Sequence, residues 1–415
     1  KGDRKGGVYT LTAVMMPAIL GFSALGVDAS LWYLMRREIQ TVADNAAIAG
    51  AYMAAANATE QEILAAAASD AGYNDFDTSE SGKNIVVNKP PLSGAYAGDP
   101  GYVEVQVTSV AVSHFIAAVL GEQITVSARA VGGPTQAGKY CIIALEETAN
   151  DALNISGTAD VVAECGAVSN SSSASSINIQ GNATLTAGSA QAYGDIQITG
   201  NATLTTDNPY HALAQRVSDP LGPEGMNLQM PPSGSCDHNN MRANGNTTLS
   251  PGRYCGGLTV QNGNVTLQPG TYIIDGGDLV ARGTSTIIGD GVTFILTGSS
   301  SGNVGDVDFA GGTVTDLVAP GSGPYAGVLF YQDPIADSSG TNRITGGSTM
   351  SLDGIIYFPS REILFTGGSG AVDSCMMIVA RLVSFEGNGY LGHDEDRCND
   401  LNISQLTQFR IKLVE

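Results

Sequence analysis

The sequence has few charged and few aromatic residues for a chain of 415 residues. Charged side chains make up 14% of it and aromatic side chains 6%, so Ser, Thr and Asn supply most of its polar surface. Only 19 residues are Lys or Arg, against 40 that are Asp or Glu, and the formal net charge is −21. Such a chain repels phosphate backbones, so we expect no nucleic-acid partner.

Charge is missing altogether from one segment near the N-terminus. Residues 8–27 carry no charged side chain, and 20 such residues are enough to span a bilayer as a helix. Basic residues precede this segment and acidic residues predominate beyond it, which places residues 1–7 in the cytoplasm and the bulk of the chain outside. Trp32 and Tyr33 follow where an interfacial aromatic belt would lie.

The same segment would also suit the core of a filament. Pilin-type helices begin in the membrane and end packed against sister helices, and Pro17, Gly21 and Gly26 permit the kink and close packing that such helices use. Asp28 is the charge closest to the span. We expect it to mark the water interface; the alternative is a buried partner for a basic group of a neighbouring subunit.

Residues 28–72 predict a helical extension. Apolar side chains recur there at steps of three and four, and Thr59 with Glu62 forms a capping box that starts a second helix. Residues 73–134 predict a small α/β module of the kind that forms the soluble part of many pilin-like proteins. Its expected elements are strands at 85–87, 102–107 and 124–131 and a helix at 112–120, which carries a surface histidine, His114.

A repeat follows this module. Residues 181–185 (GNATL) return at 200–204, and residues 245–249 (GNTTL) return as GNVTL at 263–267, with spacings of 19 and 18 residues. A fixed period of this length, with short β runs and Gly-Asn turns, is typical of a solenoid. We therefore expect residues 135–415 to form a right-handed parallel β-helix.

The spacing of the cysteines gives an independent test of this coil. No Cys-x-x-Cys pair occurs, so we expect disulfides and no zinc site. Paired in chain order, the six cysteines are 24, 19 and 23 residues apart, about one coil each, and stacked coils lie at a distance that a disulfide can bridge. The predicted bridges are Cys141–Cys165, Cys236–Cys255 and Cys375–Cys398.

The repeats carry little chemistry. Their recurring positions are Asn, Thr and Ser, without a carboxylate pair, so we expect no enzyme, no cofactor and no resident metal. The polar run at residues 392–398 could hold calcium through oxygen ligands, but we prefer a solvated loop tied down by its disulfide. A polysaccharide-binding or polysaccharide-active solenoid would need a groove with two or more carboxylates or a row of aromatic side chains.

Residues around the apolar segment resemble a known family. The motifs are GVD at 26–28, WY at 32–33, RR at 36–37 and QTVADNAA at 40–47. They resemble the bacterial TadE/TadG-like proteins of tight-adherence (Flp) pilus assembly, and SPGRYCGGL and IIYFPS resemble the longer TadG-like members. No Glu follows Gly6 or Gly7 by five residues, as it does after the cleaved Gly of prepilins, so membrane anchoring and filament incorporation both stay open.

This resemblance implies a minor pilin-like or pilus-associated protein of the cell envelope that takes part in surface attachment, and no catalytic residues. Its expected partners are other Tad pilus subunits, or copies of itself, through the N-terminal helix. We expect the membrane to contact residues 8–27 and the solenoid to be displayed in the periplasm or outside the cell, where it could contact a surface or a polysaccharide. The main alternative is a homopolymeric extracellular filament subunit with bundled N-terminal helices.

Overall fold

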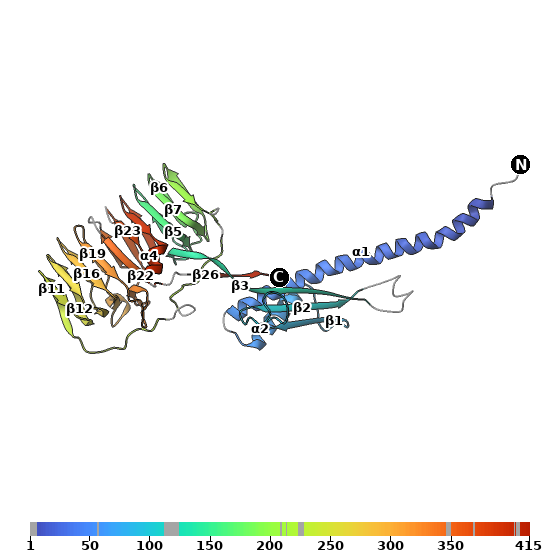
Figure 1. Ribbon diagram of the computed structural model, residues 1–415, viewed down its shortest axis with the longest axis horizontal. Coiled ribbons are helices and arrows are strands. Elements are labelled where there is room, and N and C mark those ends of the chain that lie inside the picture. The colour runs from blue at the N-terminus through green and yellow to red at the C-terminus, as the bar shows by residue number, and fades with distance from the viewer. Residues whose placement is uncertain are drawn as a thin grey trace. The chain divides into compact units, whose positions relative to one another are not determined.

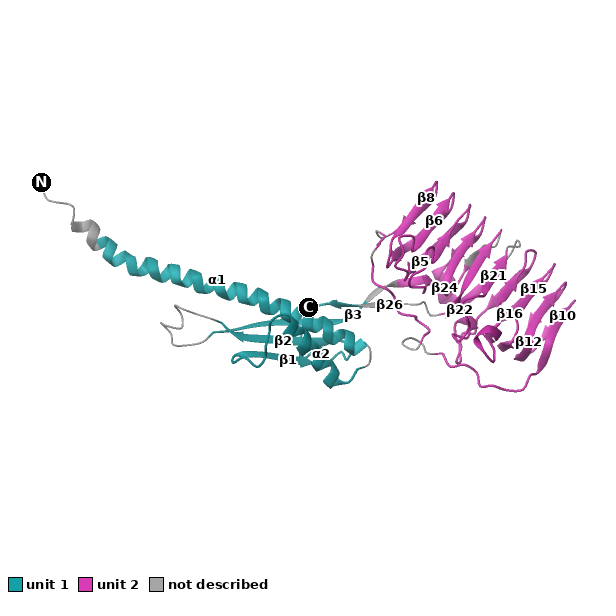
Figure 2. Cartoon of the chain, turned by 180° about the vertical axis from the view of Figure 1, so that it is seen from behind, with its two compact units in different colours: residues 1–137, 409–415 teal, residues 138–408 magenta. Residues whose placement is uncertain are grey.

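The computed structural model describes most of the chain (Figure 1). The described residues are 6–55, 58–111, 124–207, 210–212, 214–222, 228–345, 350–367, 370–401, 403 and 407–415. They form two compact units, coloured separately in Figure 2: unit 1 comprises residues 1–137 and 409–415, and unit 2 comprises residues 138–408. Unit 2 is therefore an insertion within the chain of unit 1.

The end of the chain departs from the sequence prediction, which assigned all of residues 135–415 to the solenoid. Strand β26 (Thr407–Leu413) leads back to unit 1, where Val414 donates its N–H to the carbonyl of Val131. The N–H of Val131 in turn donates to the carbonyl of Glu415. The last residues thus extend the sheet of unit 1, a pairing that no local pattern in the sequence signals.

Unit 1 is built on one long helix, α1 (Gly6–Ala55), which continues through Pro17. Its second half carries the predicted apolar stripe, and Ile39, Val42 and Ala46 of that stripe are buried. The second helix, α2 (Glu60–Tyr73), starts at the predicted capping box: Thr59 and Glu62 each accept a hydrogen bond from the other's backbone N–H. Local sequence signals therefore determine both helices.

The sheet of unit 1 packs against these helices. Strands β1 (Lys83–Asn88), β2 (Val103–Val110) and the start of β3 (Thr125–Ala144) pair antiparallel in that order. Val103, Val105 and Val107 alternate toward the buried residues of α1 and α2. The helix predicted over 112–120, with His114, lies outside the described residues.

Unit 2 is a stack of parallel strands. Its strands are β4 (Leu153–Ile155), β5 (Asp160–Ser169), β6 (Ile177–Gly181), β7 (Thr184–Ala192), β8 (Ile196–Gly200), β9 (Thr203–Thr206), β10 (His238–Asn244), β11 (Thr247–Leu249), β12 (Gly252–Gln261), β13 (Asn264–Leu267), β14 (Gly270–Asp275), β15 (Leu279–Arg282), β16 (Thr286–Asp290), β17 (Val292–Thr297), β18 (Val307–Phe309), β19 (Val314–Val318), β20 (Val328–Gln332), β21 (Thr341–Thr345), β22 (Met350–Thr366), β23 (Gly370–Ser374), β24 (Met376–Glu386) and β25 (Tyr390–His393). A 3-10 turn, η1 (Ser301–Asn303), and a short helix, α4 (Glu395–Asp400), interrupt them. The parallel pairing confirms a stacked coil, whereas its handedness stays a prediction.

The strands form three columns, one for each face of the coil. One column runs β10–β12–β15–β18–β21–β22–β24–β4–β6–β8. A second column runs β11–β13–β16–β19–β22–β23–β25–β5–β7–β9. In these two columns β4 or β5, from the first coil in sequence, follows β24 or β25 from the last, and in the third column β3 follows β24. The chain is therefore circularly permuted relative to a simple solenoid, and residues 207–237 connect its two ends.

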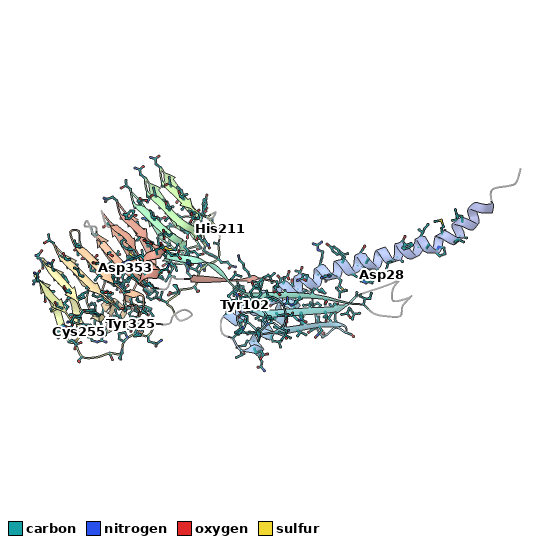
Figure 3. All side chains as sticks on the ribbon, in the orientation of Figure 1. Asp28, Tyr102, His211, Cys255, Tyr325 and Asp353 are labelled. Atoms are coloured by element: carbon teal, nitrogen blue, oxygen red, sulfur yellow. A yellow bond between two sulfur atoms is a disulfide. The ribbon has the colours of Figure 1, made fainter. Side chains whose placement is uncertain are left out.

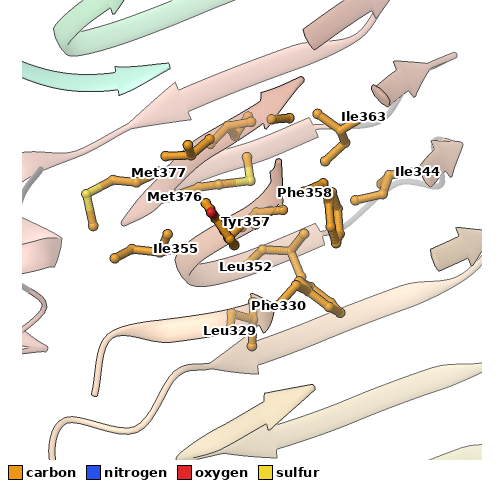
Figure 4. Close-up of a cluster of buried hydrophobic side chains, with 14 of the residues drawn as sticks. Leu329, Phe330, Ile344, Leu352, Ile355, Tyr357, Phe358, Ile363, Met376 and Met377 are labelled. Carbon is orange, nitrogen blue, oxygen red and sulfur yellow. The ribbon is translucent and has the colours of Figure 1, made fainter. Parts of the chain in front are cut away.

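Large apolar side chains fill the interior of the coil. An aromatic row follows successive coils, with ring centroids 5.9 Å apart between Tyr254 and Tyr272 and 5.4 Å apart between Phe294 and Phe330. Figure 4 shows part of this core, in which Leu352 lies beside Phe330. These rings are buried, so the row of aromatic side chains forms the core and offers no exposed binding groove.

All six cysteines are paired as predicted. The Cα–Cα distances are 5.6 Å for Cys141–Cys165, 5.7 Å for Cys236–Cys255 and 4.8 Å for Cys375–Cys398. Cys141 and Cys165 lie on the paired strands β3 and β5, as one-coil spacing requires. The period of the sequence and the period of the coil therefore coincide.

We expect loss of the Cys236–Cys255 bridge to loosen the β10 end of the stack. This bridge closes a loop of 19 residues next to the terminal strand, so the double substitution C236S/C255S should cost about 3 kcal/mol by loop entropy. Hydrogen exchange of β10 should become faster, while that of β4, many coils away, should not change. Equal acceleration in β4 and β10 would contradict a local role for this bridge.

Candidate functional site

The first half of α1 exposes apolar side chains on every side. Leu11 is 64% exposed, Val14 75% and Phe22 76%, and no charged residue lies between positions 8 and 27. The exposed large apolar residues of this stretch are Leu11, Val14, Met15, Met16, Ile19, Leu20, Phe22, Leu25 and Val27. Within the described residues, α1 is the one helix long and apolar enough to cross a membrane.

The residues predicted to serve assembly lie along this same stretch. Pro17 is exposed, Gly21 is half-buried, and a Cβ added to Gly26 would meet no atom within 4 Å. The chain itself therefore does not require glycine at position 26, which leaves space for another helix to approach closely. Trp32 is half-buried and Tyr33 is 65% exposed, and their place in an interfacial belt stays a prediction.

The burial of Asp28 differs from the prediction that we preferred. We expected it at the water interface, but its side chain is fully buried within its own chain. Figure 3 labels its position on α1. It lies on the face of α1 that also carries Ala24 and Leu31, both half-buried. A single charge after an apolar run indicates where the run ends, and it carries no information about what packs over the charge.

Comparison with known proteins identifies this helix. Residues 6–59 match the family model of Flp pilus-assembly TadE/G-like proteins, a range that covers α1 and the cap of α2. The N-terminal segment is a TadE/G-like domain. No curated protein and no solved structure matches the chain. A TadE/G-like domain with an exposed apolar helix fits a membrane-anchored envelope protein with a pilus-associated role, and it suggests contact with other components of the pilus system.

Beyond the TadE/G-like domain, the polar run at 392–398 is occupied by internal contacts. Asp394 caps α4 by accepting the N–H groups of Asp396 and Arg397. The Arg397 guanidinium also donates to the buried carboxylate of Asp353 at 2.7 Å, and Glu395 pairs with Lys139. The disulfide at Cys398 is present as predicted, but the prediction of a solvated loop is wrong: residues 395–400 form α4, and Gly392, His393 and Cys398 are buried.

A hollow of about 370 Å³ lies on unit 2 between Leu145–Glu147, the loop at residues 336–338 and residues 359–360 of β22. It contains two carboxylates, as a polysaccharide site would need. Each of them already has a cationic partner, since Arg381 lies 3.0 Å from Glu146 and Arg216 lies 3.3 Å from Glu147. This hollow is thus built from ion pairs, and contact with a polysaccharide stays a prediction.

Unit 1 contains an ion-pair cluster that no sequence motif predicts. Glu104 on β2 is fully buried and accepts hydrogen bonds from Arg129, Asn88 and Ser93, while Arg129 also pairs with Glu415. Burial alone would raise the pKa of Glu104, but these hydrogen bonds outweigh it and lower the pKa to about 2. The cluster joins residues 286 positions apart, so no local motif could have indicated it.

We expect this cluster to make unit 1 sensitive to acid. The pKa of Glu104 is lower in the folded chain than its usual 4.5, so its stabilisation is complete above about pH 4.5 and disappears as the pH falls toward 2. The substitution E104Q should cost about 2–3 kcal/mol at pH 7, seen as faster hydrogen exchange in β2. The control E80Q, at an exposed pair with Lys83, should change little. Equal effects of the two substitutions would contradict this role.

Proposed function

We propose that this chain is a minor pilin-like, pilus-associated structural and adhesion protein. Its N-terminal helix anchors it in the inner membrane and joins it to other pilus subunits. Its inserted unit, coiled as a right-handed β-helix, is displayed outside the cytoplasm. The observation that carries the proposal is the first half of α1, a TadE/G-like helix that is apolar on all sides and has little of its own chain to cover it.

The energetics of α1 support an anchoring role. Full burial of one large apolar side chain contributes about 1.5–3 kcal/mol, and nine such side chains of this stretch are at least 40% exposed. Even at half that value for each, leaving them in water would cost on the order of 10 kcal/mol. Lipid or sister helices must therefore cover this surface in the working protein.

The disulfides support display outside the cytoplasm. All six cysteines of the chain are paired in unit 2, and such bonds persist in oxidising compartments. A stack of coils that rises by about 4.8 Å per coil also gives an elongated surface without requiring a catalytic centre. Both features suit a structural element that extends from an anchored helix and contacts a surface.

Accessibility in cells tests this orientation. A cysteine at Ile288, which is 45% exposed on unit 2, should react with a membrane-impermeant maleimide in intact spheroplasts. A cysteine at Lys5, in the segment predicted to be cytoplasmic, should react only after permeabilisation. The reverse pattern would overturn the proposed display of unit 2.

A homopolymeric filament subunit is the second candidate, and the open space beside Gly26 favours it because helices in a bundle can approach there. Purified full-length chain should then form filaments with a core of α1 helices once detergent is removed. Insertion into liposomes as single chains would exclude this candidate and leave the anchored protein.

A further inference from the structure

The parallel-strand stack of unit 2 ends in open strand edges. In the described part of the chain, β8 and β9 pair only with β6 and β7, and β10 and β11 pair only with β12 and β13 (Figure 2). The described residues of the connecting segment pair with the third face at each end. At one end His211 bridges to Gln191, and at the other the N–H of Asp237 donates to the carbonyl of Arg253.

Unpaired strand edges of this kind are templates for another chain. On two of its three faces, each end presents backbone N–H and C=O groups on the side away from the stack. Solenoids usually protect such edges with a polar terminal repeat or a cap. The strands β8 and β9 are instead short repeats of the strands beneath them, so this end continues the coil pattern up to the edge.

An interior apolar column also stops abruptly at the β8 edge. Ile155, Ile179 and Ile198 occupy the same position in three successive coils. The first two are fully buried, whereas Ile198 is 40% exposed because no coil follows it. One more coil would bury this side chain and extend the column.

The β8–β9 end and the β10–β11 end have matching sequences. Their strands also run in the same direction, so one end can continue the other. The motif G-N-x-T-L lies at 200–204 in the β8–β9 coil, at one end of the stack. It lies again at 245–249 in the β10–β11 coil, at the other end. Inside the stack this motif lies in register with itself, as Leu185 lies opposite Leu204 and Leu249 opposite Leu267. Because the coils advance in one direction from β10 to β8, a second copy can add its β10 end to this β8 end with parallel strands.

The side chains at the two ends are complementary in this register. Ala243 of a second copy, a small buried residue, would lie over the exposed Ile198. The β10–β11 coil contains one charged residue, Arg242, and Asp237 precedes it; the β8–β9 coil contains none and is flanked by Asp195 and Asp207. In this register Arg242 lies opposite Gln197, so no two like charges lie directly opposite each other.

We propose that the β8–β9 end of one copy binds the β10–β11 end of a second copy, so that the parallel-strand stack continues from chain to chain. The partner is thus a second copy of this chain, bound by backbone hydrogen bonds and by burial of Ile198. This contact lies wholly within unit 2 and goes beyond the anchoring role proposed for α1.

Directed cross-linking of the full-length chain in detergent tests the proposal. Thr203 and Thr248 are exposed and hold the same motif position at opposite ends. Adjacent parallel strands are about 4.8 Å apart, within the range of a disulfide. A mixture of T203C and T248C chains should therefore give a heterodimer under mild oxidation. A mixture of T203C with I288C, whose cysteine lies in the middle of the stack, should not.

A second pair of variants separates edge pairing from unfolding. I198K in the T203C chain should lower the yield of heterodimer at least tenfold, whereas I288K, the same change at a similarly exposed mid-stack residue, should lower it less than twofold. Equal yields from T248C and I288C, or a dominant T203C homodimer, would overturn the proposal. Association through α1 would persist in I198K, so failure here leaves the anchoring function intact.

Discussion

The double substitution L20R/F22R should move the full-length chain from the membrane fraction to the soluble or aggregated fraction. Leu20 is 63% exposed and Phe22 76% exposed on the apolar half of α1. Each arginine near the centre of a membrane helix costs about 2.5–3.5 kcal/mol, so the pair costs about 5–7 kcal/mol, or more than a thousandfold in partitioning. Carbonate extraction followed by quantitative blotting measures the effect.

A matched control uses the same chemistry on the other helix of unit 1. Leu64 on α2 is 50% exposed, and L64R should leave the membrane fraction unchanged. If L20R/F22R stayed in the membrane as fully as L64R, the first half of α1 would not be the anchor.

The substitution F330A should have the largest effect on the stability of unit 2. Phe330 is fully buried at a junction of the aromatic row, with ring centroids 5.4 Å from Phe294, 6.2 Å from Phe309 and 6.3 Å from Phe358. Removing the ring leaves a cavity between coils, and such truncations cost about 3–5 kcal/mol. Hydrogen exchange of β17 and β20, together with urea unfolding, measures the loss.

An exposed aromatic residue provides the comparison. Tyr210 is 53% exposed in the connecting segment of unit 2, and Y210A should change the free energy of unfolding by less than about 0.5 kcal/mol. A cost below about 1 kcal/mol for F330A would mean that the aromatic row is not the core of the stack.

Local and periodic signals explain why some elements could be predicted from the sequence. The apolar run and stripe of α1, and the capping box at Thr59, act over a few residues and are present as expected. The disulfides follow from the coincidence of cysteine spacing with the coil period, as Cys236–Cys255 shows. Each of these features depends on residues that are close in sequence or separated by one coil.

The order of the coils could not be predicted in the same way. A period of 18 or 19 residues indicates which neighbouring segments stack, but it carries no information on where the first coil lies. Ile142 pairs opposite Ile378, and nothing distinguishes this pair in composition from any other pair of interior residues. The return of the last residues to β3, and the ion pair of Arg129 with Glu415, are hidden for the same reason.

The position of Asp28 illustrates a further limit. A sequence shows where a charge interrupts an apolar run, but burial depends on segments packed from elsewhere. The same holds for Glu104, which occupies an ordinary position in an alternating strand and becomes fully buried through partners on three other segments. Buried charges of this kind depend on long-range contacts.

Photo-cross-linking in cells tests the central claim, that lipid or sister helices cover the first half of α1, most directly. A photoreactive phenylalanine analogue at Phe22 should form adducts with lipid or with another envelope chain. The same analogue at Tyr73, which is 85% exposed on α2 and lies outside the apolar half of α1, should form neither. Absence of such adducts at position 22, or equal yields at positions 22 and 73, would contradict the anchoring and assembly role of this helix.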